Sequence, residues 1–320
     1  LAYLKDIFTR FNLRWTENNA KQALFPEGAE IIPNPVGTAA GFALPVGEKL
    51  VMVIPGVPSE TRRMVPEGVI PLLRRRFPEA VLQTVKQTIK TFGLGEAMVD
   101  QKLADVHFDA LGVSVGFYPV FPENHLVLIS RSETLEAARE NLNRAVAEVS
   151  SRLADCIFSY GEETLEQRIA AAMTEKKLTI AVAESCTGGL IADRLTDVSG
   201  SSAYFERGVV AYSNEAKMQL LGVPADILEK YGAVSEETAR RMAEGVRRSA
   251  GTNLGLSSTG IAGPTGGTKE KPVGTVYIAL ADGTQTICRH YAYRWDRRRN
   301  KLISSEAALM LLGNYLQEKK

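Results

Sequence analysis

A serine and a cysteine stand side by side in a glycine-rich turn, AESCTGG, at residues 183–189. The apolar run at 178–182 predicts a strand before this turn, and the apolar positions that recur from Leu190 predict a helix after it. A strand-to-helix junction leaves backbone N–H groups that can bind an anion beside a nucleophile. Ser185 and Cys186 are both candidate nucleophiles, since a thiol at a helix start ionises readily.

A serine hydroxyl attacks only when a neighbouring base removes its proton. Within residues 161–320 the histidine is His290, which falls in a predicted edge strand and is expected to be structural. The segment YSNEAK at 212–217 offers Tyr212 and Lys217 instead. A desolvated lysine acts as the base in serine–lysine hydrolases. The alternatives, a solvated Lys217 and a packing role for Tyr212, stay open at this point.

A third polar segment, SSTGIAGPTGG at 257–267, follows another predicted strand. Glycines let the backbone approach a ligand closely, and free N–H groups with hydroxyls cradle phosphate. No Gly-Lys-Ser/Thr follows, so this is not a Walker loop, and a mobile surface loop is the alternative. The segment RWDRRR at 294–299 offers a cation for phosphate or carboxylate, or else is a solvated helix start.

Strand and helix patterns alternate from residue 161 onward and place these segments at one edge of a sheet. The predicted strands that precede the polar segments are 178–183, 208–212 and 254–258. In α/β sheets, ligands bind beyond the carboxyl ends of such strands. A predicted hairpin and a long amphipathic helix complete the pattern, at 273–280, 285–293 and 296–316. We expect an α/β sandwich with a mostly parallel sheet and an antiparallel hairpin edge.

Two smaller units are expected before this domain. Residues 1–80 combine a helical start, two short strand-like runs, turns rich in Pro and Gly, and a helix from Ser59 towards Arg76. Residues 81–160 show a strand, a helix, two strands and a long helix, which predicts a compact α+β connecting domain. The expected domains are therefore 1–80, 81–160 and 161–320.

The composition limits which classes of partner and which cellular location we expect for this protein. The 38 Lys and Arg against 37 Asp and Glu leave a net charge of +1, which argues against nucleic acid or an anionic membrane as the main partner. No apolar run of about 18 residues predicts a membrane span. The chain lacks a signal-peptide layout and has 3 scattered cysteines, so we expect a cytoplasmic protein with free thiols and no metal site. Its first residue, Leu1, lies in a predicted mid-helix, which suggests a truncated chain.

The motifs ESCTGG, YSNEAK and STGIAGPTGG resemble those of the CinA family of competence/damage-inducible proteins, as do VSGSS at 198–202 and KPVGTV at 271–276. The resemblance runs from about Thr164 to the C-terminus. It implies a nicotinamide-nucleotide amidase, which converts nicotinamide mononucleotide and water to nicotinate mononucleotide and ammonia in pyridine-nucleotide salvage. We expect no cofactor for this reaction, a small nucleotide as partner, and a homodimer built on the connecting domain or the hairpin edge.

The resemblance also implies roles for single residues. Ser185 would be the nucleophile and Lys217 and Tyr212 its proton-handling partners, with the proton acceptor left open between them. The implied substrate-binding residues are Thr187, Gly188, Ser202, Gly260, Gly263, Thr265 and Arg297. Trp295 stands where the family's Gly-Asp-Arg motif has glycine, so the choice of phosphate-binding arginine within 294–299 stays open.

The front of the chain resembles other parts of the same family. NPVGTAAGF at 34–42 and PGVPSE at 55–60 resemble the second half of its molybdopterin-binding-like α/β domain, and residues 83–160 resemble its small connecting domain. The first of these domains is associated with ADP-ribose pyrophosphatase activity that usually needs a divalent metal. The family's Gly-Gly-Leu-Gly-Pro-Thr-x-Asp-Asp loop is absent from this sequence, so that site is expected to be incomplete. This pyrophosphatase and a non-catalytic nucleotide-binding module are the alternative functions.

Overall fold

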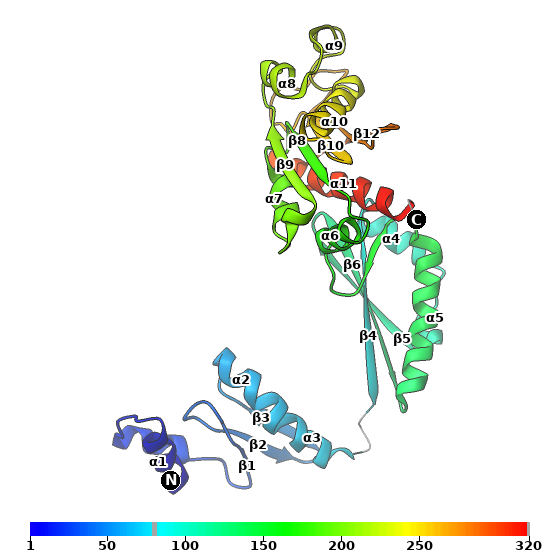
Figure 1. Cartoon of the computed structure of the whole chain (residues 1–320). Coiled ribbons are helices and arrows are strands. Elements are labelled where there is room, and N and C mark those ends of the chain that lie inside the picture. The colour runs from blue at the N-terminus through cyan, green and yellow to red at the C-terminus, as the bar shows by residue number, and fades with distance from the viewer. Residues whose placement is uncertain (79–81, 319–320) are drawn as a thin grey trace. The chain divides into compact units, whose positions relative to one another are not determined.

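The computed structural model describes residues 1–78 and 82–318, which form two compact units divided between Leu82 and Gln83 (Figure 1). Each unit has its own sheet or sheets and its own apolar core. Among the helices of the described residues, none combines the length and the apolar character that crossing a membrane requires. The second unit carries the three polar segments singled out in the sequence.

The first unit is built on a three-stranded antiparallel sheet in the order β1-β2-β3. Its core gathers Ile32, Ala43, Met64 and Leu72. The helix expected from 59 to 76 is interrupted, because Pro66 and Pro71 lack the N–H that a continuous helix needs. The elements are α1 (Ala2–Arg10), η1 (Glu17–Ala23), β1 (Glu30–Ile32), β2 (Gly41–Val46), β3 (Lys49–Val53), α2 (Pro58–Met64), the π-helical turn η2 (Val65–Val69) and α3 (Ile70–Arg76).

The second unit begins with an antiparallel sheet in the order β5-β6-β4-β7, against which α5 packs. Alternate strand residues such as Leu126 and Leu128 point into a core that α5 completes with Leu142 and Val149. Thr134 caps α5, since its hydroxyl accepts a hydrogen bond from the N–H of Ala137. The elements are β4 (Gln83–Thr91), α4 (Glu96–Leu103), η4 (Asp109–Leu111), β5 (Val113–Val120), β6 (Glu123–Ser132), α5 (Leu135–Leu153) and β7 (Ile157–Tyr160).

The rest of the second unit is a three-layer α/β sandwich around a five-stranded sheet in the order β12-β11-β10-β8-β9. Strands β10, β8 and β9 are parallel, and the β11–β12 hairpin adds an antiparallel edge. The elements are α6 (Leu165–Glu175), β8 (Ile180–Glu184), α7 (Leu190–Thr196), η5 (Ser201–Ala203), β9 (Phe205–Val210), α8 (Asn214–Leu221), α9 (Ala225–Tyr231), α10 (Glu236–Ala250), β10 (Leu254–Gly260), β11 (Thr275–Ala281), β12 (Thr286–Ala292) and α11 (Arg297–Glu318).

Successive side chains of β8 point to opposite faces of this sheet. Ile180 and Val182 pack on one face with α6, α7 and α11, whereas Ala181 and Ala183 pack on the other face with α8, α9 and α10 (Figure 1). Every residue of β8 is buried, because β8 lies inside the sheet and both its faces are covered. Residue 185, which follows the carboxyl end of β8, is therefore shielded from solvent.

The neighbouring strand β9 differs from the expectation for residues 208–212. It covers Phe205–Val210, lies at an edge of the sheet and is largely exposed. Tyr212 follows the strand and is 62% exposed, so it is not the buried strand-end residue that the sequence pattern predicted. An edge strand has one side without a partner strand, and this leaves the loop that leads to α8 at the surface.

Candidate active site

Ser185 and Lys217 meet at the carboxyl end of β8. The backbone N–H of Ser185 donates to the carbonyl of Ser258, at 2.9 Å, which ties the turn to β10. Lys217 lies in the first turn of α8, a helix capped by the hydroxyl of Ser213. The Nζ atom of Lys217 lies 3.2 Å from the Oγ atom of Ser185, and only 1% of Lys217 is exposed. The sequence left a solvated lysine open as an alternative, and the burial of Lys217 removes it.

The burial of the Lys217 amine eases the loss of its proton. Its Nζ donates to the carbonyl of Ala211 at 3.0 Å and to the carbonyl of Tyr212 at 3.1 Å. Burial lowers the pKa of Lys217 below its usual value, because the charged form loses its hydration. A neutral amine has two N–H groups and one lone pair. Once the amine has lost its proton, its two N–H groups can remain on the two carbonyls and its lone pair can face the Ser185 hydroxyl, as a general base requires.

The Glu184 carboxylate occupies the start of α7. It is fully buried and accepts hydrogen bonds from the N–H groups of Gly189, Ile191 and Ala192, at 3.0, 3.1 and 2.9 Å. The N–H groups of Ile191 and Ala192 in the first turn of α7 are therefore not free to bind a ligand. The sequence signal for this role is weak, since Glu184 is an acid that stands four residues before the first of two glycines.

Free N–H donors remain one step earlier, in the turn itself. Within residues 82–318, the N–H groups of Cys186, Thr187 and Gly188 make no hydrogen bond to the protein. Successive N–H groups without a partner beside a nucleophile are the kind of donor that a developing oxyanion requires. The turn at 186–188 is therefore the candidate for the anion-binding groups.

The Cys186 thiol is a weaker candidate nucleophile than the Ser185 hydroxyl. This thiol belongs to the apolar core, and burial raises the pKa of Cys186 to about 12. A thiol that stays protonated is a weak nucleophile. The alternative of a cysteine nucleophile, open from the sequence, is therefore not favoured by the structure.

Two further contacts shape the turn. The hydroxyls of Thr187 and Ser258 share a buried hydrogen bond of 2.6 Å, which joins the turn to β10. Gly188 has a φ of +63°, a conformation that glycine adopts without strain. A Cβ atom added at Gly188 would lie 3.4 Å from the Nζ of Lys301, so a cation borders the turn. Lys301 lies one helical turn after Arg297 on α11, and that spacing is the sequence signal for it.

Arg297 connects the other two polar segments. Its Nη1 donates to the carbonyl of Gly263 at 2.8 Å, and its Nη2 donates to the Tyr212 hydroxyl at 3.1 Å. Among arginines 294–299, Arg297 is the one that makes these contacts, whereas the guanidinium of Arg299 lies over the rings of Phe121 and Trp295. The hydroxyl of Tyr212 therefore faces an arginine, and its carbonyl faces Lys217.

The glycine-rich loop is held against the start of α11. The buried side chain of Asn300, unmarked in the sequence, donates to the carbonyls of Ala262 and Trp295 at 3.1 and 2.8 Å. Gly263 has a φ of +87°, and a Cβ atom at Gly260 would lie 2.7 Å from the carbonyl oxygen of Thr275. Both positions thus require glycine. Thr265 is exposed in this loop, and Ser202 is exposed in η5.

Comparisons with known proteins place this site in a family. A family model described as the CinA C-terminal domain matches residues 162–316, and one described as the damage-inducible protein CinA KH domain matches residues 86–159. A CinA-like protein from Syntrophus aciditrophicus is 60% identical over 317 residues, which are 99% of this chain and 76% of the relative. The chain belongs to the CinA family. A CinA-like protein from Geobacter sulfurreducens is 44% identical over 311 residues, 97% of this chain and 75% of that protein.

A solved structure is similar to about half of the chain. The crystal structure of a competence/damage inducible protein from Agrobacterium tumefaciens is 41% identical and covers 48% of this chain and 93% of its own, with a TM-score of 0.47. Ser185, Lys217 and Arg297 all lie within the segment that the CinA C-terminal model matches. The names of these relatives describe a competence/damage-inducible class, and this chain shares their family.

The first unit joins the two other motifs on which the CinA resemblance rests. The Asn34 amide donates to the Glu60 carboxylate at 2.7 Å and to the Ala39 carbonyl at 2.9 Å. Its amide oxygen accepts hydrogen bonds from the N–H groups of Val36 and Gly37. Asn34 therefore fixes the NPVG turn against the start of α2, where the PGVPSE motif ends.

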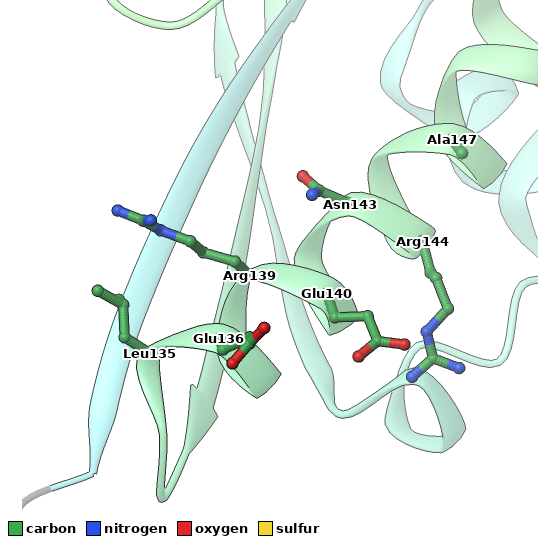
Figure 2. A pocket seen from close by; sticks show the side chains of 7 residues that line it. All are labelled: Leu135, Glu136, Arg139, Glu140, Asn143, Arg144 and Ala147. Atoms are coloured by element: carbon green, nitrogen blue, oxygen red, sulfur yellow. The ribbon is translucent and has the colours of Figure 1, made fainter.

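A broad surface hollow of about 830 Å³ lies along α5 of the CinA KH segment. Figure 2 shows its seven lining side chains, all from this one helix: Leu135, Glu136, Arg139, Glu140, Asn143, Arg144 and Ala147. Charges of both signs alternate along the helix face, as on a solvated helix. Among these lining residues there is no nucleophile beside a base, so the candidate active site remains at Ser185.

Proposed function

We propose that residues 161–320 hydrolyse the carboxamide of nicotinamide mononucleotide to nicotinate mononucleotide and ammonia, with Ser185 as the nucleophile. The observation that carries the proposal is the buried pair of Ser185 and Lys217, with 3.2 Å between Oγ and Nζ. Acyl transfer through a serine needs such a pair together with oxyanion donors. The nucleotide substrate follows from the resemblance to the CinA amidase domain.

In the first step Lys217 takes the proton of Ser185 as the Oγ atom attacks the carboxamide carbon. The carbonyl oxygen becomes an oxyanion and accepts hydrogen bonds from the N–H groups of residues 186–188. Each such donor is typically worth about 3 kcal/mol in the transition state. Lys217 then gives its proton to the amide nitrogen, the C–N bond breaks, and ammonia leaves an acyl ester on Ser185.

In the second step water attacks the ester carbon, and Lys217 accepts its proton. The C–O bond to Ser185 breaks, Lys217 returns the proton to Oγ, and the acid product ionises to the carboxylate. The same amine thus acts as base and acid in each half-reaction. Tyr212 contributes its carbonyl to the positioning of Lys217, at 3.1 Å from Nζ.

The cations at the start of α11 suit a phosphate group. Arg297 lies against the glycine-rich loop, and Lys301 borders the turn that carries Ser185. Guanidinium and ammonium groups pair well with phosphate, and loop N–H groups add further donors. A mononucleotide would thus place its phosphate near Arg297 and its carboxamide near Ser185. The alternative of a non-catalytic nucleotide-binding module does not require a buried lysine beside a serine.

The test is ammonia release from nicotinamide mononucleotide by the wild type, Ser185→Ala and Cys186→Ala. We expect Ser185→Ala to lose at least about 1,000-fold in kcat, because loss of a nucleophile removes the acyl route. Cys186→Ala should keep most of the activity, since the thiol stays protonated. Undiminished turnover by Ser185→Ala would overturn the proposal. If the wild type binds the nucleotide but releases no ammonia, the result would favour a non-catalytic nucleotide-binding module instead.

A further inference from the structure

A second pocket, of about 400 Å³, lies between the β5–β6 hairpin and the start of α11. Its aromatic walls are the rings of Phe92, Phe121, Tyr291, Tyr293 and Trp295. Small-molecule sites usually fall between about 300 and 1,000 Å³ and are mostly apolar with a few polar groups. The residues that line this pocket include none of the residues assigned above to the candidate amidase site, and the inference does not depend on that function.

The charges in this pocket are negative. Among the described residues that line it, the charged side chains are Glu96 and Glu123. The Glu123 carboxylate lies 2.5 Å from the His125 ring and is close enough to Glu306 to disfavour ionisation of that carboxyl. Aromatic faces are themselves negative, because the ring quadrupole concentrates electrons above and below the plane. The ring faces and the carboxylates thus each favour a positively charged group in the pocket.

A cation already lies on two of these rings. Phe121 and Trp295 pack edge to face, with 5.4 Å between their centroids, and the guanidinium carbon of Arg299 lies 5.4 Å from each ring centroid. This arrangement is a cation–π interaction supplied by the chain itself. Arg299 thus places one positive charge of the chain against these two rings, beside the two carboxylates of the pocket.

The remaining walls include two stacked tyrosines and two glycines. Tyr291 and Tyr293 stack with 5.6 Å between their centroids, and the buried Tyr293 hydroxyl has no hydrogen-bond partner in the part of the chain that the structure describes. At Gly93 and Gly95 an added Cβ atom would meet nothing within 4 Å, so the loop backbone is open at both positions. A ligand can therefore approach this loop closely.

We propose that this pocket binds an organic cation whose charge is shielded by alkyl groups or spread over a ring, such as a quaternary ammonium or an N-alkylated pyridinium. An anion would be repelled by Glu96 and Glu123. A neutral ligand would desolvate these carboxylates without compensating their charge. A strongly hydrated inorganic cation gains little from aromatic walls, whereas a weakly hydrated organic cation gains from walls and carboxylates together.

The test compares choline with 3,3-dimethyl-1-butanol, in which carbon replaces the charged nitrogen, by titration calorimetry on the full chain. We expect saturable binding of choline at one site and at least about tenfold weaker binding of the neutral alcohol. Glu123→Gln and Trp295→Ala should each weaken choline binding by about 5- to 30-fold, the range for a desolvated cation–π contact or ion pair. Equal affinities for the two ligands, or no saturable choline binding, would overturn the proposal.

Matched variants locate the site. Glu136→Gln removes one carboxylate from the α5 hollow of Figure 2 and should leave choline binding unchanged, and thermal unfolding checks that each variant folds. An equal loss of choline affinity in Glu136→Gln and Glu123→Gln would show that net charge causes the effect, and it would refute binding in this pocket. Ser185→Ala should bind choline as the wild type does, since loss there would move the ligand to the amidase site. The chain has 2 tryptophans, so the Trp15→Phe variant keeps Trp295 as its fluorescent reporter. The fluorescence emission of Trp295 should change as choline binds.

Discussion

Arg297 donates to the hydroxyl of Tyr212 at 3.1 Å, across 85 positions of sequence. This contact joins the start of α11 to the loop that follows β9. The same arginine holds the carbonyl of Gly263, so one guanidinium connects three segments around the candidate site. A phosphate in this place would compete for an arginine that is already oriented by the protein, and a preoriented cation loses little entropy on binding.

Replacing Arg297 with alanine should raise the KM for nicotinamide mononucleotide and change kcat much less. A hydrogen bond to a charged group contributes about 1.5–3 kcal/mol, which corresponds to a 10- to 150-fold rise in KM. Steady-state kinetics measure both constants. Arg298→Ala is the matched control, since Arg298 is exposed and the hydrogen bonds with Tyr212 and Gly263 are made by Arg297. Equal effects of the two variants would argue against Arg297 as the phosphate ligand.

Tyr212→Phe should reduce kcat by less than about tenfold. The substitution keeps the backbone carbonyl that accepts from Lys217 and removes only the hydroxyl that contacts Arg297. Loss of a general base usually costs 100- to 10,000-fold, so kinetics distinguish the two roles. A loss of that larger size would assign the proton transfer to Tyr212 and not to Lys217.

The rate should rise with pH as Lys217 loses its proton. Only the neutral amine can accept the proton of Ser185, and burial lowers the pKa of Lys217 from its usual value of 10.5. The acidic limb of kcat/KM should therefore have its midpoint below 10.5, measured as ammonia release across the pH range. Lys217→Met should lose this limb together with at least about 100-fold in kcat. An unchanged limb in a residually active Lys217→Met enzyme would assign the titration to another group.

Much of the scaffold follows from local sequence patterns. Helix α10 (Glu236–Ala250) is an example, because a Ser235 cap and a left-handed Gly251 mark both of its ends. The convergence of the turn at 183–189 and the segment at 212–217 follows from strand order, since the carboxyl ends of adjacent parallel strands meet. Helix α9 was not expected, although Pro224 precedes it and Gly232 follows it.

The partners of individual polar groups could not be predicted in the same way. The Glu184 carboxylate is bonded to N–H groups that lie 5 to 8 positions later, and many acids near a helix start make no such bond. The contacts of Asn300 with Ala262 and of Arg297 with Tyr212 join distant segments, and they depend on how α11 packs on the sheet. Residue types indicate which groups can form hydrogen bonds, whereas tertiary packing determines the partner of each group.

Glu184→Gln should destabilise the fold and lower activity together. The amide keeps one oxygen but turns an NH₂ group toward N–H donors of α7, so at least one buried hydrogen bond is lost. Loss of a bond to a charged group costs about 1.5–3 kcal/mol in the free energy of unfolding. Urea denaturation measures this loss. Glu215→Gln, an exposed acid in the first turn of α8, should change stability by less than about 0.5 kcal/mol. Equal stability of the two variants would refute the capping role.

Glu306 should make the protein less stable as the pH rises toward neutrality. This carboxyl is 1% exposed, pairs with Arg194 at 2.6 Å and leaves its Oε1 atom without a partner among the described residues. Burial raises the pKa of Glu306 to about 7, and this effect outweighs the attraction of Arg194, while the carboxylates of Glu123 and Glu166 add to the rise. The folded state therefore holds a proton that the unfolded state releases near its usual pKa of 4.5.

Between those two pKa values the unfolded chain binds fewer protons, so the contribution of Glu306 to the free energy of unfolding falls as pH rises. A shift of this size corresponds to about 3 kcal/mol, and the fall ends once the pH passes the folded pKa. Glu306→Gln carries no titrating proton and should flatten the stability curve between pH 5 and 8 relative to the wild type. Urea denaturation at a series of pH values measures the difference. Glu175→Gln, an exposed control on α6, should keep the wild-type slope. A slope that persists unchanged in Glu306→Gln would show that another group titrates.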